Sequence, residues 1–349
     1  MSRGKRIVLF WLRGICFVLI LGMTLSYALF VLTPKYDYGI CSMITLYQQE
    51  PDTVDVLVIG TSAAQAGVNT SLLWEEYGIA AFDLCSAELP YWASYFYLKE
   101  ALRTQNPRVL ILDAKPSIYM LPYSRKARVV MSTYGLQSLE NRIGSIVAST
   151  HPDNTLKFLL GFPVIHNNYQ TLTLNDFIYP TDNGGRGGGW KGFTGYEGCL
   201  DFEPPWGDTS SGKTTPIHEK QQQYFEMMLQ LAQENGINVL VIGFPTPDYV
   251  HDHPYFNTIK ALAESHGASY LNYNQPNIAE IWDYAVDFAD WQHLNIRGSA
   301  KLSMHLGAYL TEHYELPNRH DQENYASWDT YAEEWFEQYP DYRLEEEGI

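Results

Sequence analysis

Five short apolar runs, rich in β-branched residues, constrain the fold of this 349-residue chain more than any other feature. Helical patterns lie between most of these runs, and glycine, proline or asparagine ends them. Alternation of this kind predicts a parallel sheet in a three-layer α/β fold, with right-handed connections between its strands. The predicted strands cover residues 54–59, 79–85, 109–113, 238–244 and 269–273.

The regular alternation stops after the third predicted strand and resumes about a hundred residues later. We therefore interpret residues 116–215 as a long insertion in an α/β domain that covers residues 54–317. The tail at 318–349 is acidic and aromatic, and we expect a solvated, partly helical segment there. The alternative is that its aromatic residues pack onto the domain or a partner; these are Trp328, Tyr331, Trp335 and Phe336.

The N-terminus combines a basic start with an apolar run. Residues 14–32 are 19 residues without a charge, which at helical rise span about 28 Å. This predicts a cytoplasmic stub and single-pass transmembrane anchor at 1–33, then a juxtamembrane connector at 34–53. The basic end favours a cytoplasmic N-terminus and an extracytoplasmic domain held at the cell membrane. A cleaved signal peptide is the alternative, because Ser26-Tyr27-Ala28 resembles a cleavage site.

Composition limits the function further. The formal net charge of −17 argues against a nucleic-acid partner, since phosphates require a basic surface. The four cysteines form no CxxC pair, so we predict no thiolate metal site. We also expect no cofactor. The 26 tyrosines and 9 tryptophans favour a sugar-facing cleft, because these rings carry a polar tip.

A serine follows the first predicted strand of the α/β domain, in Gly60-Thr61-Ser62. Open α/β sheets bind ligands at the carboxyl ends of their strands, so Ser62 lies where a nucleophile is useful. The small residues after it, beginning with Ala63 and Ala64, leave room for backbone amides to approach an anion. The alternative interpretation is that Ser62 only caps a helix.

A matching base lies just before the last predicted helix. Asp290 and His293 are three residues apart, so the carboxylate can hold the imidazole tautomer while the other ring nitrogen faces a serine. The alternative is a surface loop in which Asp290 caps a turn and His293 is solvated. Both segments end at the same edge of the predicted sheet, and we therefore predict that Ser62, His293 and Asp290 meet.

These two segments resemble the SGNH (GDSL-type) hydrolases. Gly60-Thr61-Ser62 is similar to the nucleophile block of that family, and Asp290-Trp291-Gln292-His293 matches its Asp-x-x-His block. Leu294-Asn295, followed by Gly298, fits the continuation. The resemblance covers about residues 54–115 and 236–313. It implies a flavodoxin-like three-layer fold, with Ser62 as nucleophile, His293 as base and Asp290 as the carboxylate that orients it.

Two blocks of the family are altered in this chain. Cys85-Ser86-Ala87 stands where the family has a glycine, and Asp113-Ala114-Lys115-Pro116 stands where it has Gly-x-Asn-Asp. We therefore predict an oxyanion hole made by the backbone amides of Ser62 and of Ser86 or Ala87, with the Asn167 side chain from the insertion. The predicted substrate contacts come from Thr61, Trp291 and Trp190.

The anchor and the insertion look more like one exported branch, similar to the proteins of teichoic-acid D-alanylation and polysaccharide O-acetylation. This resemblance implies a serine esterase or O-acyltransferase that acts on an acylated glycan or related envelope polymer. It also implies a membrane-bound O-acyltransferase as partner. The altered blocks leave a second hypothesis open, which is a non-catalytic scaffold or glycan-binding protein with the same fold.

Overall fold

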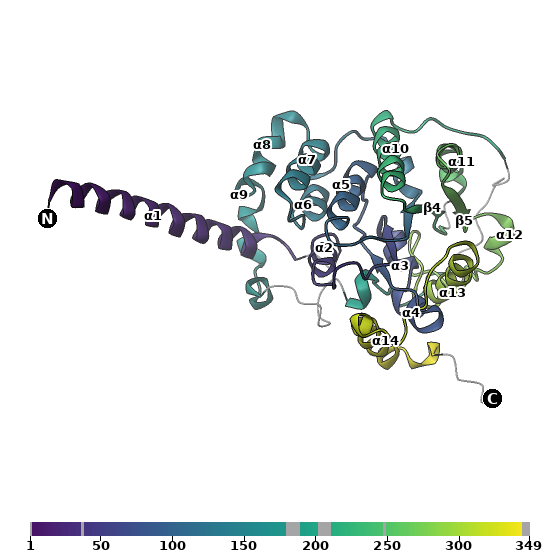
Figure 1. Cartoon of the computed structure of the whole chain (residues 1–349). Helices are drawn as coiled ribbons and strands as arrows, with labels where there is room; N and C mark the ends of the chain where they lie inside the picture. The colour runs from purple at the N-terminus through teal and green to yellow at the C-terminus, as the bar shows by residue number, and fades with distance from the viewer. Residues whose placement is uncertain (1, 36–37, 179–188, 202–210, 247–248, 344–349) are drawn as a thin grey trace. The chain divides into compact units, whose positions relative to one another are not determined.

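The computed structural model of this protein describes residues 2–35, 38–178, 189–201, 211–246 and 249–343 (Figure 1). The chain divides into two compact units. The first unit joins Met1–Lys35 to Pro152–Tyr179, and the second joins Tyr36–His151 to Pro180–Ile349. The long insertion predicted at 116–215 is therefore shared between them, because its central part belongs to the first unit.

The first unit is built on the long helix α1 (Arg3–Leu32). Among the described residues, α1 is the one helix that is long and apolar enough to cross a membrane. The side of the membrane on which each end lies stays a prediction. The rest of this unit is a series of short helices: α8 (Pro152–Leu160), α9 (Phe162–Ile165), η2 (His166–Thr171) and η3 (Leu174–Phe177).

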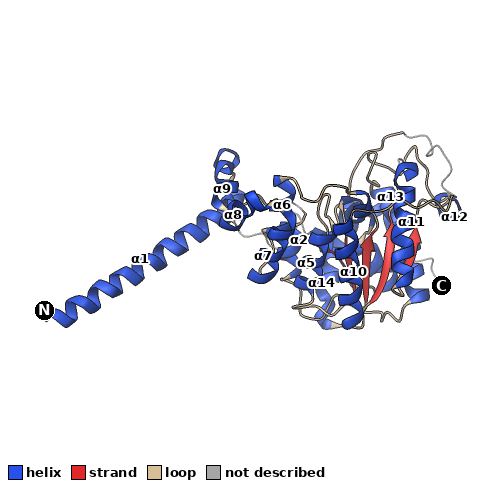
Figure 2. Cartoon of the chain, turned by 90° about the horizontal axis from the view of Figure 1, so that it is seen from above, coloured by secondary structure: helices blue, strands red, loops and turns tan. Residues whose placement is uncertain are grey.

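The second unit contains one sheet of five parallel strands in the order β2-β1-β3-β4-β5. The prediction of an α/β fold with a parallel five-stranded sheet is confirmed, and the strands occupy the predicted runs with shorter ends. Helices flank the strands on both sides (Figure 2). The strands are β1 (Val56–Ile59), β2 (Ala81–Asp83), β3 (Val109–Asp113), β4 (Asn238–Gly243) and β5 (Ser269–Asn272).

Alternate side chains of the central strands enter two separate cores, because successive residues of a strand point to opposite faces. Leu57, Leu110 and Val241 pack on one face with the helices α5 (Tyr91–Ala101), α10 (Glu219–Glu234) and α11 (Tyr249–Ser265). Val58 and Ile111 pack on the other face with α3 (Ser62–Gly67), α4 (Thr70–Tyr77) and α13 (Ile296–His313). The remaining elements of this unit are α2 (Ile40–Leu46), η1 (Lys115–Ile118), α6 (Lys126–Thr133), α7 (Leu139–Ser149), η4 (Gly189–Gly192), α12 (Pro276–Ala279), η5 (Glu323–Tyr325), α14 (Ala326–Gln338) and η6 (Pro340–Tyr342).

The C-terminal segment is not a solvated tail over 318–343. Helix α14 packs against α4, and its four large aromatic residues are buried. Arg319 adds a bidentate ion pair to Asp55, at 2.8 and 2.9 Å, beside the first strand. The packing alternative from the sequence therefore describes this segment. The connector predicted at 34–53 likewise contains a fully buried helix, α2.

Candidate active site

The turn that presents Ser62 is held tightly at the carboxyl end of β1. Helix α3 begins at Ser62, and the hydroxyl of Thr61 accepts the Ala63 N–H at 3.3 Å as its cap. A Cβ on Gly60 would lie only 2.7 Å from the Cβ atoms of both Ala64 and Asp113. Glycine is therefore required here by the close approach of β3, rather than by an unusual backbone conformation.

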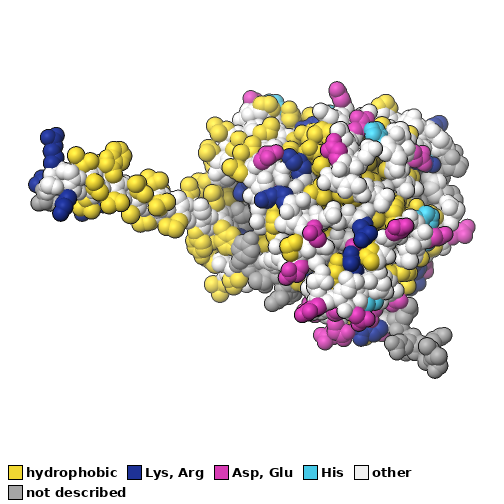
Figure 3. All heavy atoms as spheres, in the orientation of Figure 1, with side chains coloured by type: hydrophobic (Ala, Val, Ile, Leu, Met, Phe, Trp, Pro, Cys, Tyr) yellow, Lys and Arg dark blue, Asp and Glu magenta, His cyan; other side chains and the backbone are white. Residues whose placement is uncertain are grey.

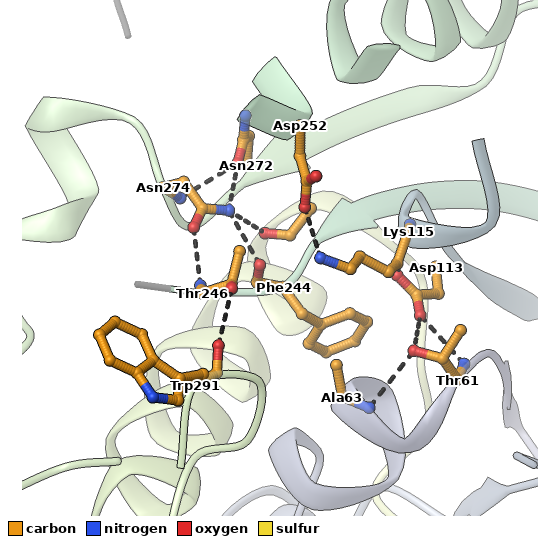
Figure 4. Close-up of polar contacts among 11 residues, drawn as sticks. Thr61, Ala63, Asp113, Lys115, Phe244, Thr246, Asp252, Asn272, Asn274 and Trp291 are labelled. Atoms are coloured by element: carbon orange, nitrogen blue, oxygen red, sulfur yellow. Dashed lines mark hydrogen bonds and ion pairs between the residues drawn. The ribbon is translucent and has the colours of Figure 1, made fainter. Parts of the chain in front are cut away.

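Asp113, at the end of β3, fixes this turn from the neighbouring strand. One oxygen of its buried carboxyl group accepts the Thr61 N–H at 3.0 Å and the Thr61 hydroxyl at 2.5 Å. The other accepts the Lys115 N–H at 2.8 Å. Burial raises the pKa of Asp113 despite these three hydrogen bonds. Figure 4 shows this cluster beside an ion pair between the amine of Lys115 and the carboxylate of Asp252.

The loop that carries Asp290 and His293 is a narrow antiparallel turn. Phe288 and Leu294 form a bridge at its base, and both side chains are buried. At the tip, Asp290 Oδ1 accepts the backbone N–H groups of Gln292, at 2.7 Å, and of His293, at 3.0 Å. This carboxylate therefore organises its own loop, as aspartate commonly does in turns.

Contacts to two other segments hold this loop in place. The Thr246 hydroxyl, after β4, donates to the backbone oxygen of Trp291 at 3.2 Å, and Asn274 accepts the Thr246 N–H at 2.8 Å (Figure 4). On the other side, the Asn295 side chain caps α13 by accepting the Gly298 N–H at 3.0 Å. Leu294, which follows His293, therefore holds the loop to the buried core, and Asn295 caps the helix that comes next.

The structure brings the three predicted residues together. His293 Nε2 lies 2.8 Å from Ser62 Oγ, and His293 Nδ1 lies 2.8 Å from Asp290 Oδ2. The imidazole is nearly enclosed, with its side chain 14% exposed, whereas the Asp290 side chain is 46% exposed. Burial opposes ionisation of Asp290, but hydrogen bonds from the His293 ring and from two backbone amides outweigh it and lower the pKa of Asp290. An ionised Asp290 accepts the Nδ1–H, which leaves Nε2 free to accept a proton from Ser62.

Tyr196 completes this arrangement and was missed from the sequence. Its ring stacks on the imidazole of His293, with centroids 4.8 Å apart and planes 12° from parallel. The backbone oxygen of Tyr196 accepts the Ile296 N–H at 3.0 Å, which ties it to the start of α13. Tyr196 lies in the irregular insertion, where no periodicity or motif distinguishes it from the other tyrosines. No signal in the sequence pointed to it.

Ser62 opens onto a small pocket that is continuous with solvent. The pocket lies at the carboxyl ends of β1, β3 and β4, which is the edge where parallel α/β sheets place their ligands. Its wall combines an apolar side with several charged and hydroxyl groups. The lining residues are Thr61, Ser62, Ala63, Glu88, Asp113, Lys115, Tyr119, Phe244, Pro245, Thr246 and Gln292.

The predicted oxyanion donors differ in their availability. The Ser86 N–H donates to the Gly60 backbone oxygen at 3.1 Å, which continues the pairing of β1 and β2 past the ends of these strands. This amide is therefore not free to bind an oxyanion, and the prediction that Ser86 is a donor is corrected. Within the described part of the chain, the N–H groups of Ser62 and Ala87 have no hydrogen-bond partner. Asn167 lies in η2 of the first unit, and its role stays a prediction.

Of the three residues predicted to contact the substrate, one lines the pocket and two lie outside it. Thr61 lines the pocket. Trp291 is 60% exposed at the tip of the loop and lies outside the lining. Trp190 lies outside it too, and its ring packs against Phe193 and Tyr339, each with centroids 6.2 Å away. Trp190 belongs to a glycine-rich segment at 183–195, of which residues 183–188 lie outside the described residues.

Comparison with known proteins adds no family to these observations. No protein-family model matches the chain, and no match to it is found among the curated proteins. No group of three or more His, Cys, Asp and Glu side chains is arranged to hold a metal ion within the ranges that the structure describes. The functional argument therefore depends on the chemistry of the Ser62 site.

Proposed function

We propose that this protein is a serine acyl-ester hydrolase or O-acyltransferase of the SGNH type, which acts through an acyl-enzyme on Ser62. The continuous hydrogen-bonded series from Ser62 to His293 to Asp290 carries the proposal. A serine hydroxyl is a weak nucleophile until a neighbouring base accepts its proton, and the 2.8 Å contact provides that base.

The reaction has two halves. In the first, Ser62 Oγ attacks the ester carbonyl carbon while its proton moves to His293 Nε2, and Asp290 and the stacked Tyr196 stabilise the imidazolium. The tetrahedral intermediate then collapses, and the alcohol leaves with the proton from His293. In the second half, His293 deprotonates an acceptor, whose oxygen attacks the acyl carbon; the bond to Ser62 Oγ then breaks, and His293 returns the proton to this oxygen. The acceptor is water in hydrolysis and a glycan hydroxyl in transfer.

Charge that develops on the carbonyl oxygen requires donors near Ser62. The N–H groups of Ser62 and Ala87 are the available amides, because the Ser86 amide is engaged with Gly60. A missing oxyanion donor typically costs about 10²–10³ in rate. We therefore expect slow turnover of small model esters compared with a hydrolase that has a complete set of donors.

The substrate and location follow from the family resemblance and from α1. We propose an extracytoplasmic site, held at the cell membrane by α1, that acts on an acylated polysaccharide or related envelope polymer. A membrane-bound O-acyltransferase would be the natural partner, since it supplies acyl groups at the same surface. The cleft of mixed polarity at Ser62 supports a polymer with both acyl and hydroxyl groups.

A fluorophosphonate tests the chemistry without knowledge of the natural substrate. The purified full-length protein should form one adduct, and peptide mapping should place that adduct on Ser62. Labelling should be lost in Ser62→Ala and strongly slowed in His293→Ala, while Ser265→Ala, which removes an exposed hydroxyl elsewhere, should react like the wild type. An adduct that persists in Ser62→Ala would contradict the proposal.

The engaged Ser86 amide favours one second candidate, a non-catalytic scaffold or glycan-binding protein that keeps the fold without a complete oxyanion hole. This candidate predicts no fluorophosphonate adduct and no turnover of acetyl esters. It also predicts glycan binding that is unchanged in His293→Ala. Esterase activity that this substitution abolishes would exclude it.

A further inference from the structure

The short helices of the first unit expose an unusual amount of apolar surface. Residues 158–175 form a run of 18 residues without Asp, Glu, Lys or Arg. None of the residues of α8, η2 or η3 is buried. Large apolar side chains stand exposed on these elements, the most exposed being Leu174 at 85%. Leu156 and Leu160 of α8 and Phe177 of η3 are exposed too, as are Phe162 in α9 and Ile178 just after η3.

Helix α8 gathers its leucines on one exposed face. At 100° per residue, Leu156, Leu159 and Leu160 share one face of the helix, while exposed Asn154 lies on the opposite face, next to the half-buried Phe158. Asn154 accepts a hydrogen bond from the amine of Lys157 at 3.2 Å. An exposed apolar face with a polar face behind it is typical of helices that lie in a membrane interface.

The apolar elements are attached to one end of α1. The Asn168 side chain donates to the Leu32 backbone oxygen at 2.9 Å, and α1 contacts α9, η2 and η3. Apart from the half-buried Leu9, side chains of α1 are exposed through Tyr27, and they become half-buried or buried from residue 28 onward. Figure 3 shows the basic residues gathered at the N-terminal end of α1 and hydrophobic side chains along its length. The attached elements therefore lie at the C-terminal end of the apolar run.

The position of the attached elements along α1 sets the depth at which they would lie in a bilayer. The apolar run ends at Leu32, and the attached elements cover α1 from residue 28, which is an overlap of about 7 Å at helical rise. Interfacial helices bury their apolar faces about 5–10 Å into the boundary between headgroups and acyl chains. Soluble monomers rarely expose contiguous apolar patches of this kind.

We infer that residues 152–178 form a monotopic membrane element, whose apolar side chains lie in the lipid interface beside the C-terminal end of α1. The occupant of this surface is the bilayer, because the surface is continuous with a helix apolar enough to cross that bilayer. The inference concerns the first unit alone and does not depend on the chemistry of Ser62.

Spin labels on the full-length protein test this inference. The exposed cysteines are first removed as Cys16→Ala and Cys199→Ser, and the buried Cys41 and Cys85 are retained. Single nitroxide labels are then placed at Leu160→Cys and Leu174→Cys, with Asn154→Cys as the matched control on the polar face of α8. A label at Leu21→Cys reports the interior of the bilayer. The protein is reconstituted into vesicles of phosphatidylcholine and phosphatidylglycerol.

The readout is the collision rate of each label with oxygen, which concentrates in the bilayer, and with a water-soluble nickel chelate. We expect the oxygen-to-nickel ratio at the labels on Leu160 and Leu174 to lie between the ratios at Leu21 and Asn154, clearly above that at Asn154. Equal ratios at all three positions of the attached elements would overturn the inference. So would labels that neither reagent reaches, since another part of the chain or a protein would then cover the surface. Protein that does not float with the vesicles would also overturn it. Circular dichroism checks that each variant is folded.

Discussion

Replacing Asp290 by asparagine is the sharpest perturbation of the proposed mechanism. Asp290 Oδ1 accepts the backbone N–H groups of Gln292 and His293, so an asparagine must keep its single oxygen at that place. Its NH₂ group then occupies the Oδ2 position, 2.8 Å from His293 Nδ1 in the wild type. The NH₂ group cannot accept the Nδ1–H, so only the oxygen at the Oδ1 position, 2.9 Å from Nδ1, remains as its acceptor, and the tautomer with the proton on Nε2 is favoured. In that tautomer Nε2 faces Ser62 without a lone pair.

The expected loss of rate follows from the change in the His293 tautomer. A base with its proton on the wrong nitrogen no longer accepts the Ser62 proton, which in comparable serine enzymes costs about 10²–10⁴ in rate. This corresponds to about 3–5 kcal/mol in the activation barrier. We place Asp290→Asn toward the lower half of this range, because the Asp290 side chain is 46% exposed and water can partly compensate.

The assay is the second-order rate of Ser62 modification by a fluorophosphonate, which requires no natural substrate. Glu280→Gln provides a matched control, since it removes one unit of charge from an exposed side chain and leaves the loop intact. Thermal unfolding of both variants separates a loss of reactivity from a loss of fold. If Asp290→Asn reacts as fast as the wild type, the proposed role of Asp290 as the group that orients His293 is wrong.

Three further predictions concern neighbouring groups. Gly60→Ala should destabilise the protein by about 1–3 kcal/mol and slow Ser62 modification, because the new methyl group overlaps Asp113; unchanged thermal unfolding and rate would contradict the tight turn. Tyr196→Ala should slow modification roughly 2–10-fold through loss of ring stacking, whereas Tyr196→Phe should not. Glu100→Gln should lower the free energy of unfolding by about 2–4 kcal/mol at neutral pH, since this buried carboxylate accepts hydrogen bonds from five groups, whereas exposed Glu140→Gln should not. Burial opposes ionisation of Glu100, but its hydrogen bonds outweigh this effect and lower its pKa in the folded protein. The difference in the free energy of unfolding between Glu100→Gln and the wild type should therefore be full above about pH 4.3 and shrink as the pH falls through the folded-state pKa. Denaturant unfolding at several pH values measures this difference.

The sequence alone determined the strands and pointed to the groups that form the candidate site. Apolar runs of β-branched residues predicted all five strands, because burial on both faces of a parallel sheet requires them. The same order along the chain placed Ser62 after the first strand and His293 before the last long helix. These inferences succeed because strand burial, turn chemistry and helix caps depend on residues close together in the sequence.

Tertiary structure decided which distant groups meet. Ser62 and His293 are 231 residues apart, and their 2.8 Å contact depends on strand order and on the anchoring of one loop by Thr246 and Asn295. The stacking of Tyr196 and the engagement of the Ser86 amide left no local pattern. Contacts across a sheet arise from the register of separate segments, which no single segment encodes. The sequence therefore supplied the chemical groups, and packing selected the neighbours among which each of them works.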